Sequence, residues 1–172
     1  LGYSVAPGVC DKDGISASVL FADLAAHAKD SGTDVIGRLE ELYRRHGLWV
    51  STQRRVVRPG TEGAAELAEP MERLGASPPE TLGDVTVAGF TDFRIGAEGR
   101  PRYLAATPLV ALDLGAKGRV LVRPSGTEPK LKIYVDLTTE LVAGDTLAET
   151  EQRLLGQAEE LAGIVVERLG LG

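Results

Sequence analysis

The spacing of apolar residues predicts two helices at the start of the chain. Residues 13–30 carry an apolar residue every three or four positions, and Asp13 is placed to cap the first turn. Residues 33–47 repeat this spacing, with Thr33 as the expected cap and Gly47 as the expected stop. Only a few turn residues separate the two helices, so we expect them to be neighbours.

The pattern changes at Trp49, where apolar and polar residues begin to alternate with the period of a β-strand. The expected elements are a strand over 49–60, a helix over 61–75 that Pro70 breaks or kinks, a strand over 84–95, a hairpin over 109–123, a strand over 131–137 and a helix over 145–169. Strands joined by hairpins and flanked by helices predict an α+β domain, with an antiparallel sheet covered on one face.

The amino-acid composition and the net charge indicate which classes of partner the protein does not bind. The 172 residues are 43% hydrophobic, enough for a core, and the net charge of −6 argues against nucleic acid or an anionic membrane as partner. No apolar run approaches the roughly 18 residues of a membrane span. Cys10 is the only cysteine, and the first residues lack the features of a signal peptide. These features predict a cytoplasmic protein without disulfides.

The stretch RPSGTEPK connects two predicted strands and concentrates groups that bind phosphate. The guanidinium of Arg123 offers a planar fork of donors to two phosphate oxygens. Ser125 and Thr127 add hydroxyl donors, and Gly126 lets the backbone approach an anion closely. Lys130 adds positive charge where the loop ends. All these groups are local in sequence, so the site needs no remote residue to bind an anion.

An ordinary polar turn would use many of the same residue types. Glu128 also counts against a plain anion pocket, because its carboxylate could orient Arg123 or Lys130, or accept a hydrogen bond from a sugar hydroxyl. We expect no metal site and no catalytic residue in the chain: His27 and His46 have no ligand partner at a suitable spacing. No role is assigned to Arg100.

Two stretches resemble the α-D-phosphohexomutases, the phosphoglucomutase and phosphomannomutase superfamily. VLVRPSGTEPKLKIYVD resembles the phosphate-binding loop and flanking strands of that family, and LGYSVAPGVCDKDGISA resembles the segment after its sugar-binding loop. The resemblance implies that residues 1–48 end the third, sugar-binding domain. It also implies that residues 49–172 form the fourth domain, which has a TATA-binding-protein-like fold.

The resemblance implies an isomerase that transfers phosphoryl groups and interconverts sugar 1-phosphates and 6-phosphates through a bisphosphate. The loop, through Arg123, Ser125, Gly126, Thr127 and Lys130, would hold the phosphate that is not reacting. The family's nucleophilic serine and its magnesium site lie in N-terminal domains whose motifs do not occur in this chain.

The expected partners are therefore a phosphorylated hexose or pentose and the N-terminal domains of the same protein, with a sugar 1,6-bisphosphate as activator. The chain alone is expected to be inactive. The alternative is a standalone anion-binding or regulatory module that does no chemistry.

Overall fold

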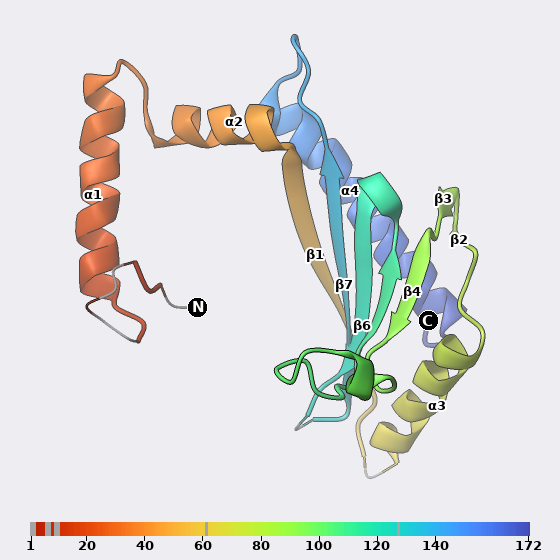
Figure 1. Cartoon of the computed structure of the whole chain (residues 1–172). Helices are drawn as coiled ribbons and strands as arrows, with labels where there is room; N and C mark the ends of the chain where they lie inside the picture. Colours follow the sequence, from red (N-terminus) through yellow and green to blue (C-terminus); the bar gives the residue numbers. More distant parts are fainter. Residues whose placement is uncertain (1–2, 6–7, 9–10, 61, 127) are drawn as a thin grey trace. The chain divides into compact units, whose positions relative to one another are not determined.

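The computed structural model describes residues 3–5, 8, 11–60, 62–126 and 128–172, and it divides into two compact units, Leu1–Gly47 and Leu48–Gly172. Each unit has its own secondary structure, shown from red to blue along the chain in Figure 1. Within the described residues, no helix has the length and apolar content that crossing a bilayer requires.

The first unit contains the two predicted helices, α1 (Gly14–Asp30) and α2 (Val35–His46). Asp13 caps α1 as predicted, because its side chain accepts a hydrogen bond from the Ile15 backbone N–H at 2.9 Å. The expected cap of α2 was wrong by one residue. Asp34 takes that position, and its Oδ1 accepts from the Gly37 N–H at 2.7 Å, since a carboxylate is a stronger acceptor than the neighbouring hydroxyl.

Large apolar side chains of this unit are exposed. Ile15 is 81% exposed, Val19 65% and Ile36 62%, and α2 has no buried residue. A helix with an apolar stripe is stable in water only when that stripe packs against another surface. The two helices therefore do not form a core of their own.

The second unit is built on a five-stranded antiparallel sheet with the strand order β1-β7-β6-β5-β4 (Figure 1). The bounds are β1 Leu48–Val57, β4 Gly89–Asp92, β5 Val110–Asp113, β6 Gly118–Pro124 and β7 Lys130–Thr139. Smaller elements are the hairpin of β2 Thr81–Leu82 and β3 Val85–Thr86, and the 3₁₀ turns η1 Ala97–Gly99 and η2 Gly115–Lys117. The predicted α+β class, with its antiparallel sheet, is confirmed.

One face of the sheet is the core. Alternate residues of β7 are buried, namely Leu131, Ile133, Val135 and Leu137. They face α4 (Leu147–Arg168), whose buried residues include Leu154, Ala158, Leu161 and Val165. Helix α4 contacts both β1 and β7 along the sheet (Figure 1). The helix predicted over 145–169 is thus confirmed, with observed bounds at Leu147 and Arg168.

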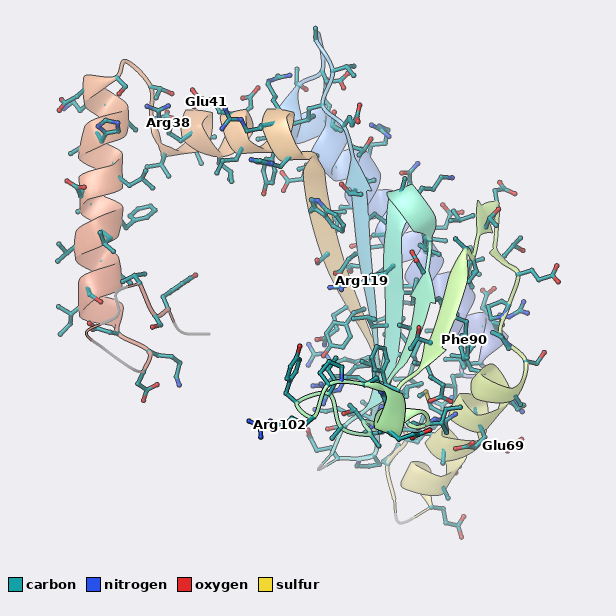
Figure 2. The ribbon with its side chains drawn as sticks, in the orientation of Figure 1. Arg38, Glu41, Glu69, Phe90, Arg102 and Arg119 are labelled. Atoms are coloured by element: carbon teal, nitrogen blue, oxygen red, sulfur yellow. The ribbon has the colours of Figure 1, made fainter. Side chains whose placement is uncertain are left out.

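Among the described residues of this unit, no α-helix covers the opposite face of the sheet, although the β4–β5 connection with η1 lies in front of its lower end; we call it the open face (Figure 1). Its residues are the ones between the buried positions, because side chains alternate along a strand. Arg119 and Asp136 are direct cross-strand partners there, joined by an ion pair of 2.8 Å that is completed by Ser51 at 2.7 Å; Arg119 is labelled in Figure 2. Opposite charges that face each other across two strands stabilise the sheet.

Helix α3 (Gly63–Ala76) continues through Pro70, so the helix does not break there; the expected kink stays a prediction. A proline in a helix removes one backbone donor and crowds the preceding turn. Here the cost is offset by packing, because Pro70 itself is buried together with Leu67, Met71 and Leu74 on the same side of the helix.

A charged network holds α3 to the end of β4. Arg94 binds Asp92 through two nitrogens, at 2.9 and 2.6 Å, and also pairs with Glu72 of α3. The Asp92 side chain is only 8% exposed. The hydrogen bond from Arg94 lowers the pKa of Asp92 below its usual value, against the opposing effect of burial. Asp92 is therefore a largely covered anion whose charge is stabilised mainly by Arg94.

Arg100 has a structural role that the sequence does not suggest. Its Nη2 donates to the carbonyls of Phe93 and Ile95, at 3.0 and 2.9 Å, and its guanidinium lies 5.2 Å from the centre of the Phe93 ring. These contacts hold the middle of the β4–β5 connection against the residues that directly follow β4. A substitution of Arg100 would therefore disturb this connection.

Replacing Gly118 with alanine should destabilise the second unit strongly. Gly118 has a φ of 131°, and an added Cβ would lie 2.0 Å from the Asp136 carbonyl oxygen of the neighbouring strand. We expect a loss of at least about 2 kcal/mol in the free energy of unfolding, measured by urea denaturation. Gly163→Ala is the control, because its Cβ would meet no atom within 4 Å and alanine favours the helix. Equal stability of the two variants would contradict this account of the β6–β7 pairing.

Asp92→Asn should lower the stability of the second unit by about 1.5–3 kcal/mol at pH 7, the usual range for a hydrogen bond to a charged group. Because the folded-state pKa of Asp92 is lowered, its contribution is present above the unfolded pKa of about 3.9 and disappears as the pH falls through the folded value. The difference between wild type and variant should therefore shrink below about pH 4.

Urea denaturation at a series of pH values measures this difference. Glu98→Gln, an exposed carboxylate of η1, is the matched control and should have no such effect. A loss of stability for Asp92→Asn that is the same at pH 7 and pH 3 would show that packing, and not the charge, accounts for it.

Candidate anion-binding site

The RPSGTEPK stretch forms the turn between β6 and β7, and backbone hydrogen bonds hold its shape. The Ser125 N–H donates to the Lys130 carbonyl at 2.8 Å, and the Lys130 N–H donates to the Glu128 carbonyl at 2.7 Å. From outside the turn, the Arg58 N–H donates to the Pro129 carbonyl at 3.0 Å. The turn is therefore fastened to the residue that follows β1 as well as to its own strands.

Arg123 lies on the open face of the sheet, at the end of β6. Its neighbour Val122 is fully buried on the core face, so the alternation of the strand turns Arg123 the other way. The side chain is exposed, and within the described residues it makes no side-chain hydrogen bond or ion pair. A guanidinium with free donors beside a turn is well placed to bind an anion.

The other predicted ligands are placed as follows. Ser125 is half-buried and lines a cavity of about 300 Å³ between the turn and the Leu67–Met71 side of α3. Gly126 is exposed, and a Cβ added to it would meet no atom within 4 Å, so its backbone is open to a ligand. Thr127 lies outside the described residues.

Lys130 and Glu128 form an ion pair. The sequence left three roles for Glu128: to orient Arg123, to orient Lys130 or to accept a hydrogen bond from a sugar. The structure shows its contact with Lys130. The Lys130 ammonium is largely covered, with 18% of its side chain exposed, whereas 60% of the Glu128 side chain is exposed. Lys130 is thus already paired with an anion, and its contribution to ligand binding is smaller than that of a free lysine.

Sequence reasoning missed Lys132. It is the direct cross-strand partner of Arg123, and it lies on the same open face because Leu131 and Ile133 on either side are buried. A signal was available, since Lys130 and Lys132 are two positions apart and must share a face of one strand. Its placement beside Arg123 depended on the register of the hairpin, which residue types alone do not set.

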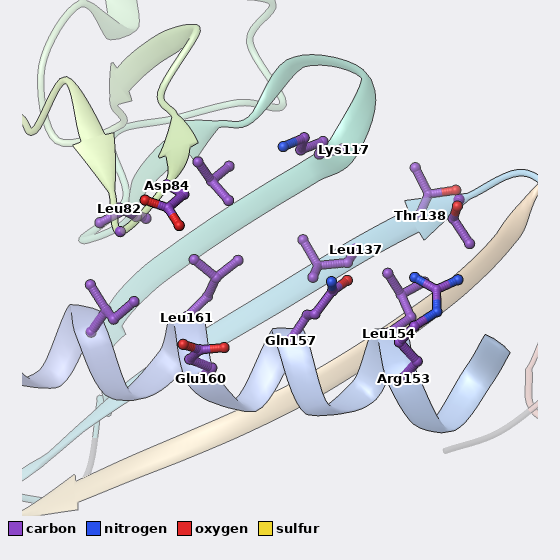
Figure 3. Close-up of a pocket in the computed structure, with 14 residues that line it drawn as sticks. Leu82, Asp84, Lys117, Leu137, Thr138, Arg153, Leu154, Gln157, Glu160 and Leu161 are labelled. Atoms are coloured by element: carbon purple, nitrogen blue, oxygen red, sulfur yellow. The ribbon is translucent and has the colours of Figure 1, made fainter. Parts of the chain in front are cut away.

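Another cavity, of about 440 Å³, lies between α4, the β2–β3 hairpin and the ends of β6 and β7 that are far from the turn (Figure 3). Figure 3 shows Asp84, Lys117 and Arg153 at its rim and Leu161 on its floor. No predicted ligand of the anion lines this cavity. The candidate site is therefore the charged surface at the β6–β7 turn.

No group of three or more His, Cys, Asp or Glu side chains that could hold a metal ion occurs in the part of the chain that the structure describes. The chemistry at the turn is that of hydrogen-bond donors and positive charge. Among the described residues of the turn, the Ser125 hydroxyl makes no hydrogen bond to a base, and the donors and positive charge there are suited to binding an anion.

Comparison with known proteins shows which family this chain resembles. Residues 92–153 match the family described as "Phosphoglucomutase/phosphomannomutase, C-terminal domain", and that match includes the β6–β7 turn. The chain is 35% identical over 137 residues to a probable phosphomannomutase of Haemophilus influenzae, covering 79% of this chain and 26% of that protein. It is 26% identical over 146 residues to the human phosphopentomutase, covering 80% and 24%.

Among solved structures, the open form of pp63/parafusin, a phosphoglucomutase from Paramecium, is similar with a TM-score of 0.49 and 18% identity. That similarity covers 93% of this chain and 28% of the other. The chain spans about a quarter of the length of the curated relatives named above.

Proposed function

From the premise that residues 92–153 of this chain form a phosphoglucomutase/phosphomannomutase C-terminal domain, we propose that the β6–β7 turn binds the phosphate of a phosphorylated sugar. The observation that carries the proposal is the position of Arg123, which is free of side-chain partners among the described residues and lies beside Lys132 on the open face. Two adjacent cations next to a turn with an accessible backbone suit a phosphate monoester, which carries close to two negative charges at neutral pH.

The bound phosphate would be the one that is not reacting. The turn offers donors and positive charge, and its described Ser125 hydroxyl has no base beside it, so we expect the turn to hold the substrate and not to form bonds. Binding energy gained at such a remote group is used to position the reacting end of the substrate. Arg123 would provide the directional part of this contact through its planar fork, with Ser125 and Gly126 beside it.

The protein to which this domain belongs would be an isomerase that interconverts sugar 1-phosphates and 6-phosphates through a bisphosphate. The curated relatives named above are a probable phosphomannomutase and a phosphopentomutase, so the substrate class we propose is a phosphorylated hexose or pentose. A sugar 1,6-bisphosphate would be its activator, and its place of action the cytoplasm.

Magnesium would act in other domains of the same protein. The acidic residues described here do not group into a site that fits the ion, so none of them is given a role in holding it. We also propose that residues 1–48 are the end of the sugar-binding domain and that residues 49–172 are the phosphate-binding domain that follows it; the two compact units divide one residue earlier, between Gly47 and Leu48.

In the complete enzyme, Arg123→Ala should lower kcat/KM about ten- to a hundredfold. This range corresponds to the roughly 1.5–3 kcal/mol typical of a charge-assisted hydrogen-bonding group. The loss should be seen mainly in KM and partly in kcat, because the same contact holds and positions the substrate. Arg123→Lys should recover only part of the loss, since it keeps the charge but not the fork. Steady-state kinetics measures each variant.

Arg54→Ala is the matched control for these kinetics. Arg54 is an exposed arginine of the same sheet, but it is the cross-strand partner of the buried Ile133 and therefore lies on the other face. Arg100 would be a poor control because of its contacts with Phe93 and Ile95. If Arg123→Ala behaves like Arg54→Ala, the turn is only a connection between strands.

The 172-residue chain alone should show no mutase activity. It offers a phosphate site but neither the nucleophile nor the metal ligands that phosphoryl transfer requires in this family. A coupled assay with a sugar 1-phosphate, magnesium and a bisphosphate primer tests this. Turnover above a control prepared from cells without the gene would show that the chain carries chemistry that we have not assigned to it.

A further inference from the structure

The positive charge at the site continues across the sheet beyond the turn. Arg55 of β1 is the cross-strand partner of Lys132 of β7, which is in turn the partner of Arg123 of β6. Val56 beside Arg55 is buried, so Arg55 also lies on the open face. Directly opposed residues have Cβ atoms about 4.5–5.5 Å apart. We call these three side chains the cation row.

The cation row is an unfavourable arrangement for a sheet that has no anion bound to it. Like charges directly opposite each other destabilise a sheet, whereas the same open face pairs Arg119 with Asp136. Within the described residues, none of the three cations has a side-chain hydrogen bond or an ion pair. They also lie together in a chain whose net charge is −6. A bound anion would remove this mutual repulsion.

The acidic side chain of Glu128 interacts electrostatically with the cation row. It is ion-paired with Lys130, and the hydrogen bond from Lys130 is the main reason why its pKa is lowered. Lys132 and Arg55 lower that pKa further through their charges, so the carboxylate lies within electrostatic reach of the cation row. An incoming phosphate would meet this negative charge at the edge of its site.

We propose that Arg55 and Glu128 set the affinity of the site for a phosphate monoester in opposite directions. Arg55 extends the site onto the edge strand and attracts the dianion, whereas Glu128 is a built-in counter-ion that weakens its binding. The four cations, Lys130 included, exceed the charge of Glu128 and of a phosphate monoester of about −1.5 to −2 together, so the site favours a dianion over a singly charged ligand. This inference rests on the proposed function of the turn.

The test is a titration of the 172-residue chain with inorganic phosphate at pH 8, in which backbone amide NMR shifts report binding. The titration is done at low ionic strength and again near 0.15 M salt. We expect Arg55→Ala to raise the dissociation constant about three- to tenfold, as one charge acting on a dianion several ångströms away in water predicts. Glu128→Gln should lower it by a similar factor. Both effects should shrink at the higher salt, where the Debye length is about 8 Å.

Arg54→Ala, on the other face of β1, should stay within about twofold of wild type, since its guanidinium is directed away from the site. Arg55→Lys should bind like wild type, because the effect requires charge and not the shape of the side chain. The amide spectra of the free variants establish in the same experiment that each one is folded.

The outcomes distinguish failure of the roles given to Arg55 and Glu128 from failure of the proposed phosphate binding by the turn. If wild type binds phosphate and Arg55→Ala matches Arg54→Ala, the extension of the site to the edge strand is wrong. If Glu128→Gln binds no more tightly than wild type, the carboxylate orients Lys130 and is not an opposing charge. If folded wild type shows no shifts at residues 123–132 in millimolar phosphate, the proposed function of the turn fails, and this inference fails with it.

Discussion

The pairing of β7 with both of its neighbours is the constraint on which the rest of the second unit depends. β7 is paired with β1 along ten positions and with β6 along seven. Because side chains alternate along each strand, the register of the strands decides which side chains lie on the core face and which lie on the open face. It brings Leu131, Ile133 and Val135 under α4, and it aligns Lys132 with Arg123 and Arg55 on the open face. A slip by one residue would bury the cations and expose the core.

The same pairing explains why the site needs few residues outside the turn. The turn is closed by backbone hydrogen bonds between its own ends, and the Arg58 N–H fastens it to the end of β1. Helix α3 lies next to the turn, and the Arg94 network holds α3 to β4. The donors facing solvent are therefore held by rigid elements, which lowers the entropy cost of binding an anion.

Charge is distributed unevenly over this unit. The open face places opposite charges together at the Arg119–Asp136 pair and like charges together at the cation row. The first arrangement stabilises the sheet, whereas the second destabilises it unless, as we propose, an anion binds there. Stability and binding thus compete at one end of the sheet, as is common at sites that bind charged ligands.

The sequence by itself determined the order and type of most elements, from the helices α1, α2 and α4 to the hairpins around β6, because periodicity and turn residues act locally. It also indicated Arg123, Ser125 and Gly126 as candidate ligands, since these residues are adjacent in one turn. It did not predict the continuity of α3 through Pro70, which depends on burial of that residue. Nor did it place Arg55 beside Lys132, because partners far apart in the chain meet only through the register of a sheet. That register is decided by the fit of the whole apolar face against α4, a property of the tertiary structure and not of any short stretch.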